Sequence, residues 1–142
     1  VVANTCTTAL TGGATAVTLP TVLTSALTTA GNTAGDTAFS LNVTGCDATA
    51  ATRGIHYTLT PSGYDATNNS LLDNTGTANN VGVEILEGAT PIAFAGAPRQ
   101  TANVTLDGAG AGSVSLAARY QATGAATAGT VTSALNWTLV YN

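Results

Sequence analysis

The sequence has almost no charge, and it contains no lysine and no methionine. Only 7% of its 142 residues are charged, and the basic ones are three arginines, Arg53, Arg99 and Arg119. Binding to nucleic acid requires a basic surface that neutralises phosphates, and binding to an anionic membrane requires clusters of Lys and Arg. Three scattered arginines in a chain of net charge −4 form neither surface. We therefore expect no nucleic-acid partner and no membrane-surface partner.

Long apolar runs are missing as well. A membrane-spanning helix needs about 18 or more consecutive apolar residues, and the sequence has no such run. No signal peptide precedes Val1, which we interpret as a mature or trimmed start. Low charge together with 44% hydrophobic residues argues against disorder. We expect one folded domain over residues 1–142 that does not span a membrane.

Side chains that support catalysis or metal binding are scarce. His56 is the only histidine, and because it alternates with Ile55 and Tyr57 we expect it on the outer face of a strand. Residue order alone permits a Ser-His-Asp triad, but no nucleophile-elbow pattern occurs. We expect the acidic residues to be solvated, without the convergence across a cleft that a glycosidase needs. They are Asp36, Asp47, Asp65, Asp73 and Asp107 in loops, and Glu84 and Glu87 around one strand end.

Two further patterns give no support to a cofactor or a metal. The glycines from Gly108 to Gly112 are followed by neither a lysine nor a helix, so we interpret them as a flexible hairpin loop rather than a phosphate site. A zinc site needs four ligands, and only His56 could join the two cysteines as a soft ligand. We expect no catalytic residue, no cofactor, no metal and no enzymatic activity.

Cys6 and Cys46 are the only cysteines. Two thiols in a chain rich in Thr, Ala and Gly and nearly free of charge suggest an oxidising compartment and one disulfide. Two buried free thiols remain the alternative at this point.

Short stretches of alternating apolar residues, separated by turn residues, run along the whole chain. This pattern predicts an antiparallel β-sandwich without a convincing amphipathic helix. The turn-rich stretch 21–36 predicts an irregular connection with one helical turn near Leu23–Leu27, and 47–53 and 62–80 predict loops. We expect strands over 1–7, 16–19, 37–46, 54–61, 81–86, 89–94, 102–106, 113–120 and 130–141.

The last strand is the most informative part of the chain. Its apolar residues occupy alternate positions, which indicates a strand with one buried face. Such a stripe is ordinary core in many sandwiches. Here the strand reaches the end of the sequence, so its neighbour must lie elsewhere in the chain or on another molecule. The apolar positions are Val131, Leu135, Trp137, Leu139 and Tyr141.

The stretch before this strand, residues 118–129, reads A-R-Y-Q-A-T-G-A-A-T-A-G, and Tyr141 is the penultimate residue. This ending resembles the C-terminal signature of chaperone–usher pilus subunits, the type 1 fimbrial major subunits in particular. Tyr120 and Gly129, fourteenth from the end, belong to the matching motif. Weaker matches at 39–47 and 80–86 extend the resemblance over nearly the whole chain.

The resemblance implies an all-β fold: an incomplete immunoglobulin-like β-sandwich that lacks its last strand and is completed by a donor strand from another chain. It also implies a disulfide between Cys6 and Cys46, which ties the first strand to the end of the second. A groove for the donor strand, or for a chaperone strand, lies beside the first and last strands. We expect its residues to be Val2, Val131, Leu135, Trp137, Leu139 and Tyr141.

The function implied is that of a structural subunit of a surface pilus, or fimbria, which polymerises by donor-strand exchange and supports adhesion and biofilm formation. The implied partners are neighbouring copies of the same or related subunits, with a periplasmic chaperone and an outer-membrane usher during assembly. The implied location is the surface of a Gram-negative bacterium, after export through the periplasm. A minor, adaptor or adhesin-type pilus subunit is the alternative. Only five residues precede Cys6, so we expect the N-terminal donor extension of the family to be absent from this chain.

Overall fold

The computed structural model describes residues 6–10, 16–46, 54–61, 63, 71–94, 99–101 and 104–141, and the structural statements below concern these residues. The chain forms β-strands and one short 3-10 turn. They are β1 (Thr7–Leu10), η2 (Thr24–Ala26), β2 (Thr33–Thr44), β3 (Ile55–Pro61), β4 (Leu71–Leu72), β5 (Val81–Glu87), β6 (Thr90–Pro91), β7 (Arg99–Gln100), β8 (Gly112–Ala122) and β9 (Leu135–Tyr141).

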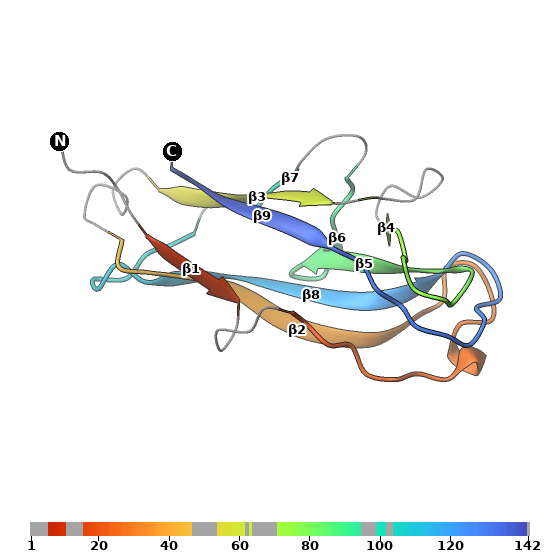
Figure 1. Cartoon of the computed structure of the whole chain (residues 1–142). Helices are drawn as coiled ribbons and strands as arrows, with labels where there is room; N and C mark the ends of the chain where they lie inside the picture. Colours follow the sequence, from red (N-terminus) through yellow and green to blue (C-terminus); the bar gives the residue numbers. More distant parts are fainter. Residues whose placement is uncertain are drawn as a thin grey trace.

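Two antiparallel sheets face each other. The large sheet has six strands in the order β1-β2-β8-β5-β4, with β6 paired to β5, and the small sheet has the order β7-β3-β9. Figure 1 shows β3 and β9 in one layer and β1, β2, β8 and β5 in the facing layer. The predicted all-β sandwich is therefore confirmed.

The core lies between the sheets and consists of alternate residues of the central strands. Because successive side chains of a strand point to opposite faces, an alternating apolar pattern supplies one face to this core. Each fully buried aliphatic or aromatic side chain contributes about 1.5–3 kcal/mol. The buried core residues include Leu41, Val43, Ile55, Tyr57, Leu59, Val83, Ile85, Val114 and Leu116.

Four strands lie close to their predicted positions: β3, β5, β8 and the C-terminal part of β2. β2 begins at Thr33, four residues earlier than predicted, because a bulge lets the chain continue its pairing with β8. The bulge contains Gly35, which has a φ of +72° and lies against the Tyr120 ring. A Cβ at Gly35 would lie 2.9 Å from that ring, so the close approach requires glycine.

Several predicted strands are wrong in extent or position. Residues 16–19 have no strand partner, and 130–134 precede β9 instead of belonging to it. An alternating sequence forms a strand only where a neighbour supplies hydrogen bonds, and none of the described strands pairs with either segment. The predicted strand 89–94 is reduced to β6, and β7 lies before the predicted strand 102–106, of which Val104 makes an isolated bridge with Ile55.

Two other differences concern short strands. The first predicted strand, 1–7, lies mostly outside the described residues, and the observed β1 starts at its end. The pair Leu71–Leu72 was predicted as loop but forms β4 beside β5. This pairing is close because Gly82 has no side chain: a Cβ there would lie 2.9 Å from the Leu72 carbonyl oxygen. A two-residue strand gives too short a pattern to be recognised in the sequence.

The prediction that His56 lies at the surface is wrong. The residue is only 9% exposed and is followed by fully buried Tyr57. It lies on β3, the central strand of the small sheet, and pairs with Val140 of β9.

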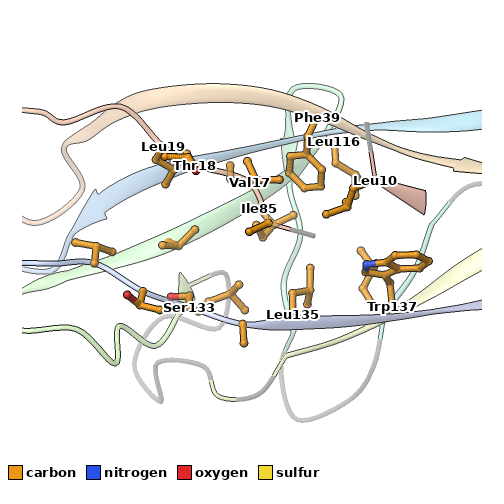
Figure 2. A pocket seen from close by; sticks show the side chains of 18 of the residues that line it. Leu10, Val17, Thr18, Leu19, Phe39, Ile85, Leu116, Ser133, Leu135 and Trp137 are labelled. Atoms are coloured by element: carbon orange, nitrogen blue, oxygen red, sulfur yellow. The ribbon is translucent and has the colours of Figure 1, made fainter. Parts of the chain in front are cut away.

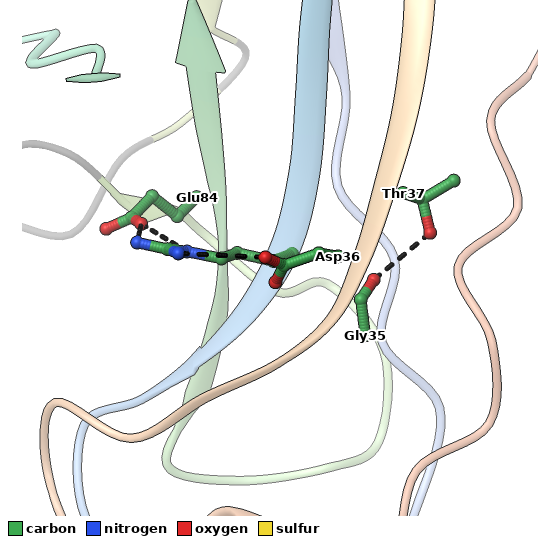
Figure 3. Close-up of polar contacts among 5 residues, drawn as sticks. Gly35, Asp36, Thr37 and Glu84 are labelled. Atoms are coloured by element: carbon green, nitrogen blue, oxygen red, sulfur yellow. Dashed lines mark hydrogen bonds and ion pairs between the residues drawn. The ribbon is translucent and has the colours of Figure 1, made fainter. Parts of the chain in front are cut away.

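The prediction that the acidic residues are solvated is wrong for Glu84. Its side chain is 3% exposed and accepts a 2.6 Å hydrogen bond from Nε of Arg119, with a second contact from Nη2 of the same guanidinium. Arg119 also lies 3.9 Å from the exposed carboxylate of Asp36, and dashed lines in Figure 3 mark these contacts. The pairing is possible because β2, β8 and β5 are adjacent strands. Asp73 and Asp107 are exposed, as predicted, and Asp47 and Asp65 lie outside the described residues.

Cys6 and Cys46 form a disulfide, with a Cα–Cα distance of 4.5 Å. The bond joins the residue before β1 to the end of β2, which is the connection that the resemblance implies. The Cys46 N–H donates to the Gly110 carbonyl oxygen at 3.0 Å, so the same end of β2 is also fixed to the loop before β8.

Candidate functional site

Two open strand edges, one from each sheet, border the same groove. Among the described residues, β9 pairs only with β3 and β1 pairs only with β2. The groove has a volume of about 530 Å³. Figure 2 shows Leu10 and Leu19 on one side of it and Leu135 and Trp137 on the other. Open strand edges of this kind invite pairing with another strand.

The floor of the groove is apolar and is formed by both sheets. It lies where alternate core residues would meet a further strand. Most of these residues are buried by the two sheets themselves, and Phe39 is partly buried. No charged residue lies among the described residues that line the groove, and its polar members carry hydroxyl groups. The floor residues are Phe39, Leu41, Leu59, Leu72, Val83, Ile85, Leu116 and Ala118.

One side of the groove, which we call the first wall, is formed by residues 131–135 and Trp137. Trp137 belongs to β9 and is held in this wall by an aromatic contact. Its ring meets Tyr57 edge to face, with centroids 5.7 Å apart at 78°. The Tyr57 hydroxyl donates to the Asn42 carbonyl oxygen of β2 at 3.3 Å, so this side chain joins the two sheets. Burial raises the pKa of Tyr57 to about 12. The contact keeps β9 at a fixed separation from the large sheet.

In β9, the backbone N–H and C=O groups of every second residue point towards the open edge. The carbonyl oxygens of Tyr57 and Ile55 in β3 accept hydrogen bonds from the N–H groups of Thr101 and Val104, at 2.9 Å and 2.7 Å. The backbone N–H and C=O groups of the odd-numbered residues of β3 therefore point away from β9. Since backbone direction alternates along a strand, the even-numbered residues of β3 pair with the even-numbered residues of β9. The N–H and C=O groups that point to the open edge are therefore those of Leu135, Trp137, Leu139 and Tyr141.

The opposite wall consists of Leu10 at the end of β1 and the segment 16–19. Pro20, the residue after this segment, is fixed to β8, because the Tyr120 hydroxyl donates to the Pro20 carbonyl oxygen at 2.9 Å. Burial raises the pKa of Tyr120. The segment therefore lies along the groove, and no described strand pairs with it.

Beyond Leu135 the first wall continues through residues 130–134, which contact the loop 73–78. Thr75 N–H donates to the Thr132 carbonyl oxygen at 2.8 Å, and Ala78 N–H donates to that of Thr130 at 3.0 Å. Gly129 sits immediately before this contact, where a Cβ would lie 2.6 Å from the Ala78 nitrogen. Only glycine fits this approach, which gives a physical reason for the glycine in the matched motif.

The predicted groove residues divide into four groups. Val131, Leu135 and Trp137 line the groove together with Tyr120. Leu139 lies further along β9 and packs against the core. Tyr141 pairs through its backbone with Ile55, whereas Val2 lies outside the described residues.

Sequence reasoning missed the residues of the opposite wall and the floor. For Phe39, Leu41, Ile85 and Leu116 the signal was present, because each was an apolar position in a predicted alternating strand. Their place in a groove depends on which two strands leave an edge open, which alternation does not encode. Val17 and Leu19 were predicted within a strand, but their role in the wall follows only from the fold.

Among the described residues, no group of three or more His, Cys, Asp or Glu side chains could hold a metal ion. No helix within this part of the chain is long and apolar enough to cross a membrane.

The fold is similar to that of pilus proteins with known structures. The P pilus rod subunit PapA matches with a TM-score of 0.73 at 17% identity, over 96% of this chain and 99% of PapA. A type I fimbria protein and antigen of Burkholderia pseudomallei matches with a TM-score of 0.71 at 24% identity, over 96% and 100%. The CupB6 tip adhesin of Pseudomonas aeruginosa matches with a TM-score of 0.64 at 20% identity over 80% of this chain, which spans only 32% of the adhesin.

A search of curated protein sequences gives no match. The family model described as "Fimbrial protein" matches the sequence over residues 1–142. This match covers the open groove, the disulfide and the C-terminal motif alike, and the chain belongs to the fimbrial protein family.

Proposed function

We propose that this chain is a structural subunit of a chaperone–usher surface pilus, and that a strand from a neighbouring subunit fills its groove. The observation that carries the proposal is the pair of open edges, which face each other across an uncharged apolar floor. A strand placed between them would pair with both edges and bury its inward side chains. This is recognition by strand addition.

The energetics favour an extended apolar occupant. A donor strand that inserts four or five apolar side chains would gain roughly 6–15 kcal/mol before ordering costs. The whole stability of a domain is typically only about 5–15 kcal/mol, so the contribution of the occupant is comparable to that of the domain. A charged side chain facing the floor would lack a partner and oppose binding.

The residues that we propose to contact the occupant are those on the first wall and near the start of β1. The backbone of β9 supplies hydrogen bonds, and its inward side chains meet the apolar face of the donor. They are Val2, Val131, Leu135, Trp137, Leu139 and Tyr141.

The open edges also imply partners before polymerisation. An uncovered apolar groove favours aggregation, so we propose that a periplasmic chaperone supplies a strand first and that exchange for the donor of the next subunit follows at the outer-membrane usher. The assembled fibre would lie on the surface of a Gram-negative bacterium and support adhesion and biofilm formation. In this role the chain catalyses no reaction.

A second candidate is a minor, adaptor or adhesin-type subunit of the same pathway. The similarity to the CupB6 tip adhesin favours it, because 80% of this chain matches one part of that longer protein. Electron microscopy of purified surface fibres, with antibody labelling of this chain, separates the two. Labelling along the shaft indicates a main subunit, and labelling at tips or junctions indicates the alternative.

Refolding with a donor peptide tests the proposed groove. We expect a peptide of alternating apolar and polar residues to raise the melting temperature by tens of degrees. A control peptide of the same composition with its apolar residues grouped at one end should have little effect. A chain that melts cooperatively at the same temperature with and without the alternating peptide, as a monomer, would contradict the proposal.

A further inference from the structure

The first wall of the groove pairs with β3 on one side of Leu135 and with a loop on the other side. In the small sheet, β3 pairs with β9 as far as the pair Pro61 and Leu135, where β3 ends. Residues 130–134 continue the wall beyond this point, and none of the strands in the described part of the chain pairs with them. Something other than the sheet must keep them extended.

The loop 73–78 takes the place of β3 along this part of the wall. Besides the two backbone hydrogen bonds from Thr75 and Ala78, the Ser133 hydroxyl donates to the Asp73 carbonyl oxygen at 2.6 Å. Thr77 and Thr130 also exchange hydrogen bonds, each hydroxyl oxygen accepting from the backbone N–H of the other residue at 2.9 Å. The loop therefore contacts both ends of the segment 130–133.

The side chain of Asn74 lies at the centre of this contact. Its Oδ1 accepts from the N–H groups of Gly76 at 2.7 Å and Thr132 at 2.8 Å. Its Nδ2 donates to the carbonyl oxygens of Ala78 at 2.9 Å and Thr130 at 3.3 Å. One amide thus joins the loop to two successive even-numbered residues of the wall.

These contacts determine which backbone groups remain for an occupant. Thr130 and Thr132 direct their N–H and C=O groups towards the loop. Because backbone direction alternates in an extended chain, those of Val131 and Ser133 point the other way. This is the odd-numbered set that also points to the open edge in β9, so the two segments form one continuous edge.

We infer that Asn74 is a positioning residue for donor-strand binding, because it extends the acceptor edge from Leu135 back to Val131. The inference rests on the proposed function of the groove. At about 3.3 Å per residue, residues 130–133 add roughly 13 Å of edge to that of β9. Without Asn74, the Thr132 N–H and the Thr130 carbonyl oxygen lose the amide that holds them towards the loop, and Val131 and Ser133 lose their orientation.

Residue-resolved hydrogen exchange with a bound donor tests this. The probe is a synthetic alternating apolar peptide of about nine residues, long enough to span both segments. In the wild-type chain we expect the peptide to slow exchange at Val131, Ser133, Leu135, Trp137 and Leu139. In Asn74→Ala we expect protection at Val131 and Ser133 to fall about tenfold or more, whereas Trp137 and Leu139 keep theirs.

Two further variants make the test specific. Asn79→Ala alters an exposed asparagine next to the loop and should leave all five positions protected. Asn74→Asp retains the oxygen that accepts from Gly76 and Thr132, but it turns a carboxylate oxygen instead of a donor towards the Ala78 and Thr130 carbonyl oxygens. Its protection at Val131 and Ser133 should therefore fall at least as far as in Asn74→Ala. It also provides the measurement if Asn74→Ala does not fold.

The outcomes separate the inference from the proposed function. If the peptide protects none of the five positions in the wild-type chain, the proposed groove is wrong. If it protects all five in the wild-type chain, and Asn74 variants lose protection equally at Val131 and Trp137 or at neither, the groove stands and the positioning role is wrong.

Discussion

The large and small sheets of this protein differ in how their strands are held. β8 lies inside the large sheet between β2 and β5, and Arg119 joins the same three strands through Asp36 and Glu84. In the small sheet β9 pairs on one side only, and its other edge faces the groove. The difference shows that β8 has both of its edges paired within its own sheet, whereas β9 leaves the backbone groups of one edge available to a partner.

We expect the largest effect from a substitution at the open edge of β9. Trp137→Asp places a charge on the uncharged groove wall and removes the ring that contacts Tyr57. We expect the alternating donor peptide to lose nearly all of its effect on the melting temperature, because an unpaired charge is costly to bury.

Thr138→Asp is the matched control for this change. Thr138 is the next residue of β9 and is exposed on its outer face, so the donor peptide should still raise the melting temperature of that variant. Equal shifts in the wild-type chain and Trp137→Asp would show that the peptide does not occupy the groove.

The next effect concerns the buried ion pair between Arg119 of β8 and Glu84 of β5. Arg119→Met leaves the Glu84 carboxylate buried without its cation, which costs about 3–5 kcal/mol of unfolding free energy. Urea denaturation measures the loss. The double variant Arg119→Met with Glu84→Gln should recover much of it, because no uncompensated charge remains.

Asp36→Asn serves as the control within the same cluster. Its side chain is 68% exposed and 3.9 Å from Arg119, so we expect a loss of at most about 1 kcal/mol. Losses of the same size from Asp36→Asn and Arg119→Met would show that the buried position of Glu84 does not matter.

A smaller effect concerns the contact between the two sheets. The folded-state pKa of Tyr57 is raised from 10.0 to about 12, so the folded protein holds this proton more strongly than the unfolded chain. The resulting stability is complete below pH 10 and is lost as the pH rises towards 12, up to about 2–3 kcal/mol. Tyr57→Phe should remove this part of the alkaline loss and cost about 1 kcal/mol at neutral pH.

Thermal melts at pH 8, 10 and 11 measure this dependence. Burial also raises the pKa of Tyr120, so Tyr120→Phe is compared in parallel and should remove a separate part. If Tyr57→Phe shows the same alkaline loss as the wild-type chain, the hydroxyl of Tyr57 does not contribute to it.

The smallest effect provides a baseline outside both sheets. Leu23 precedes η2 and is 76% exposed, the one large apolar side chain of this kind among the described residues. Leu23→Ser should change the unfolding free energy by no more than about 0.5 kcal/mol. A larger change in urea denaturation would mean that Leu23 has a packing role that its exposure does not show.

The sandwich could be predicted from the sequence because its central strands have one apolar face. The alternation in β3, β5 and β8 directly reflects the packing of side chains against the opposite sheet. The segments 16–19 and 130–134 have the same kind of pattern, but no strand within the described residues pairs with them. Whether an alternating segment becomes a strand depends on its neighbour, and that information is not local.

The polar contacts were harder to predict for a related reason. Glu84 lies between two core residues of β5, and its partner Arg119 is 35 positions away in the sequence. Asn74 is one of many asparagines, and what distinguishes it is its distance to Thr130 and Thr132. His56 was predicted at the surface because it alternates with the core residues Ile55 and Tyr57, and alternation does not show whether another part of the chain covers the outer face of a strand. Such features require the register of strand pairing, which composition and spacing do not provide.

The shortage of basic residues has a consequence for proteolysis. Trypsin cleaves after lysine and arginine, and in this chain it can cut only after Arg53, Arg99 and Arg119. Arg119 lies within β8, whose backbone is paired on both sides. Cleavage there requires β8 to leave its neighbours, so the rate at which the fragment 120–142 appears reports how often the large sheet opens.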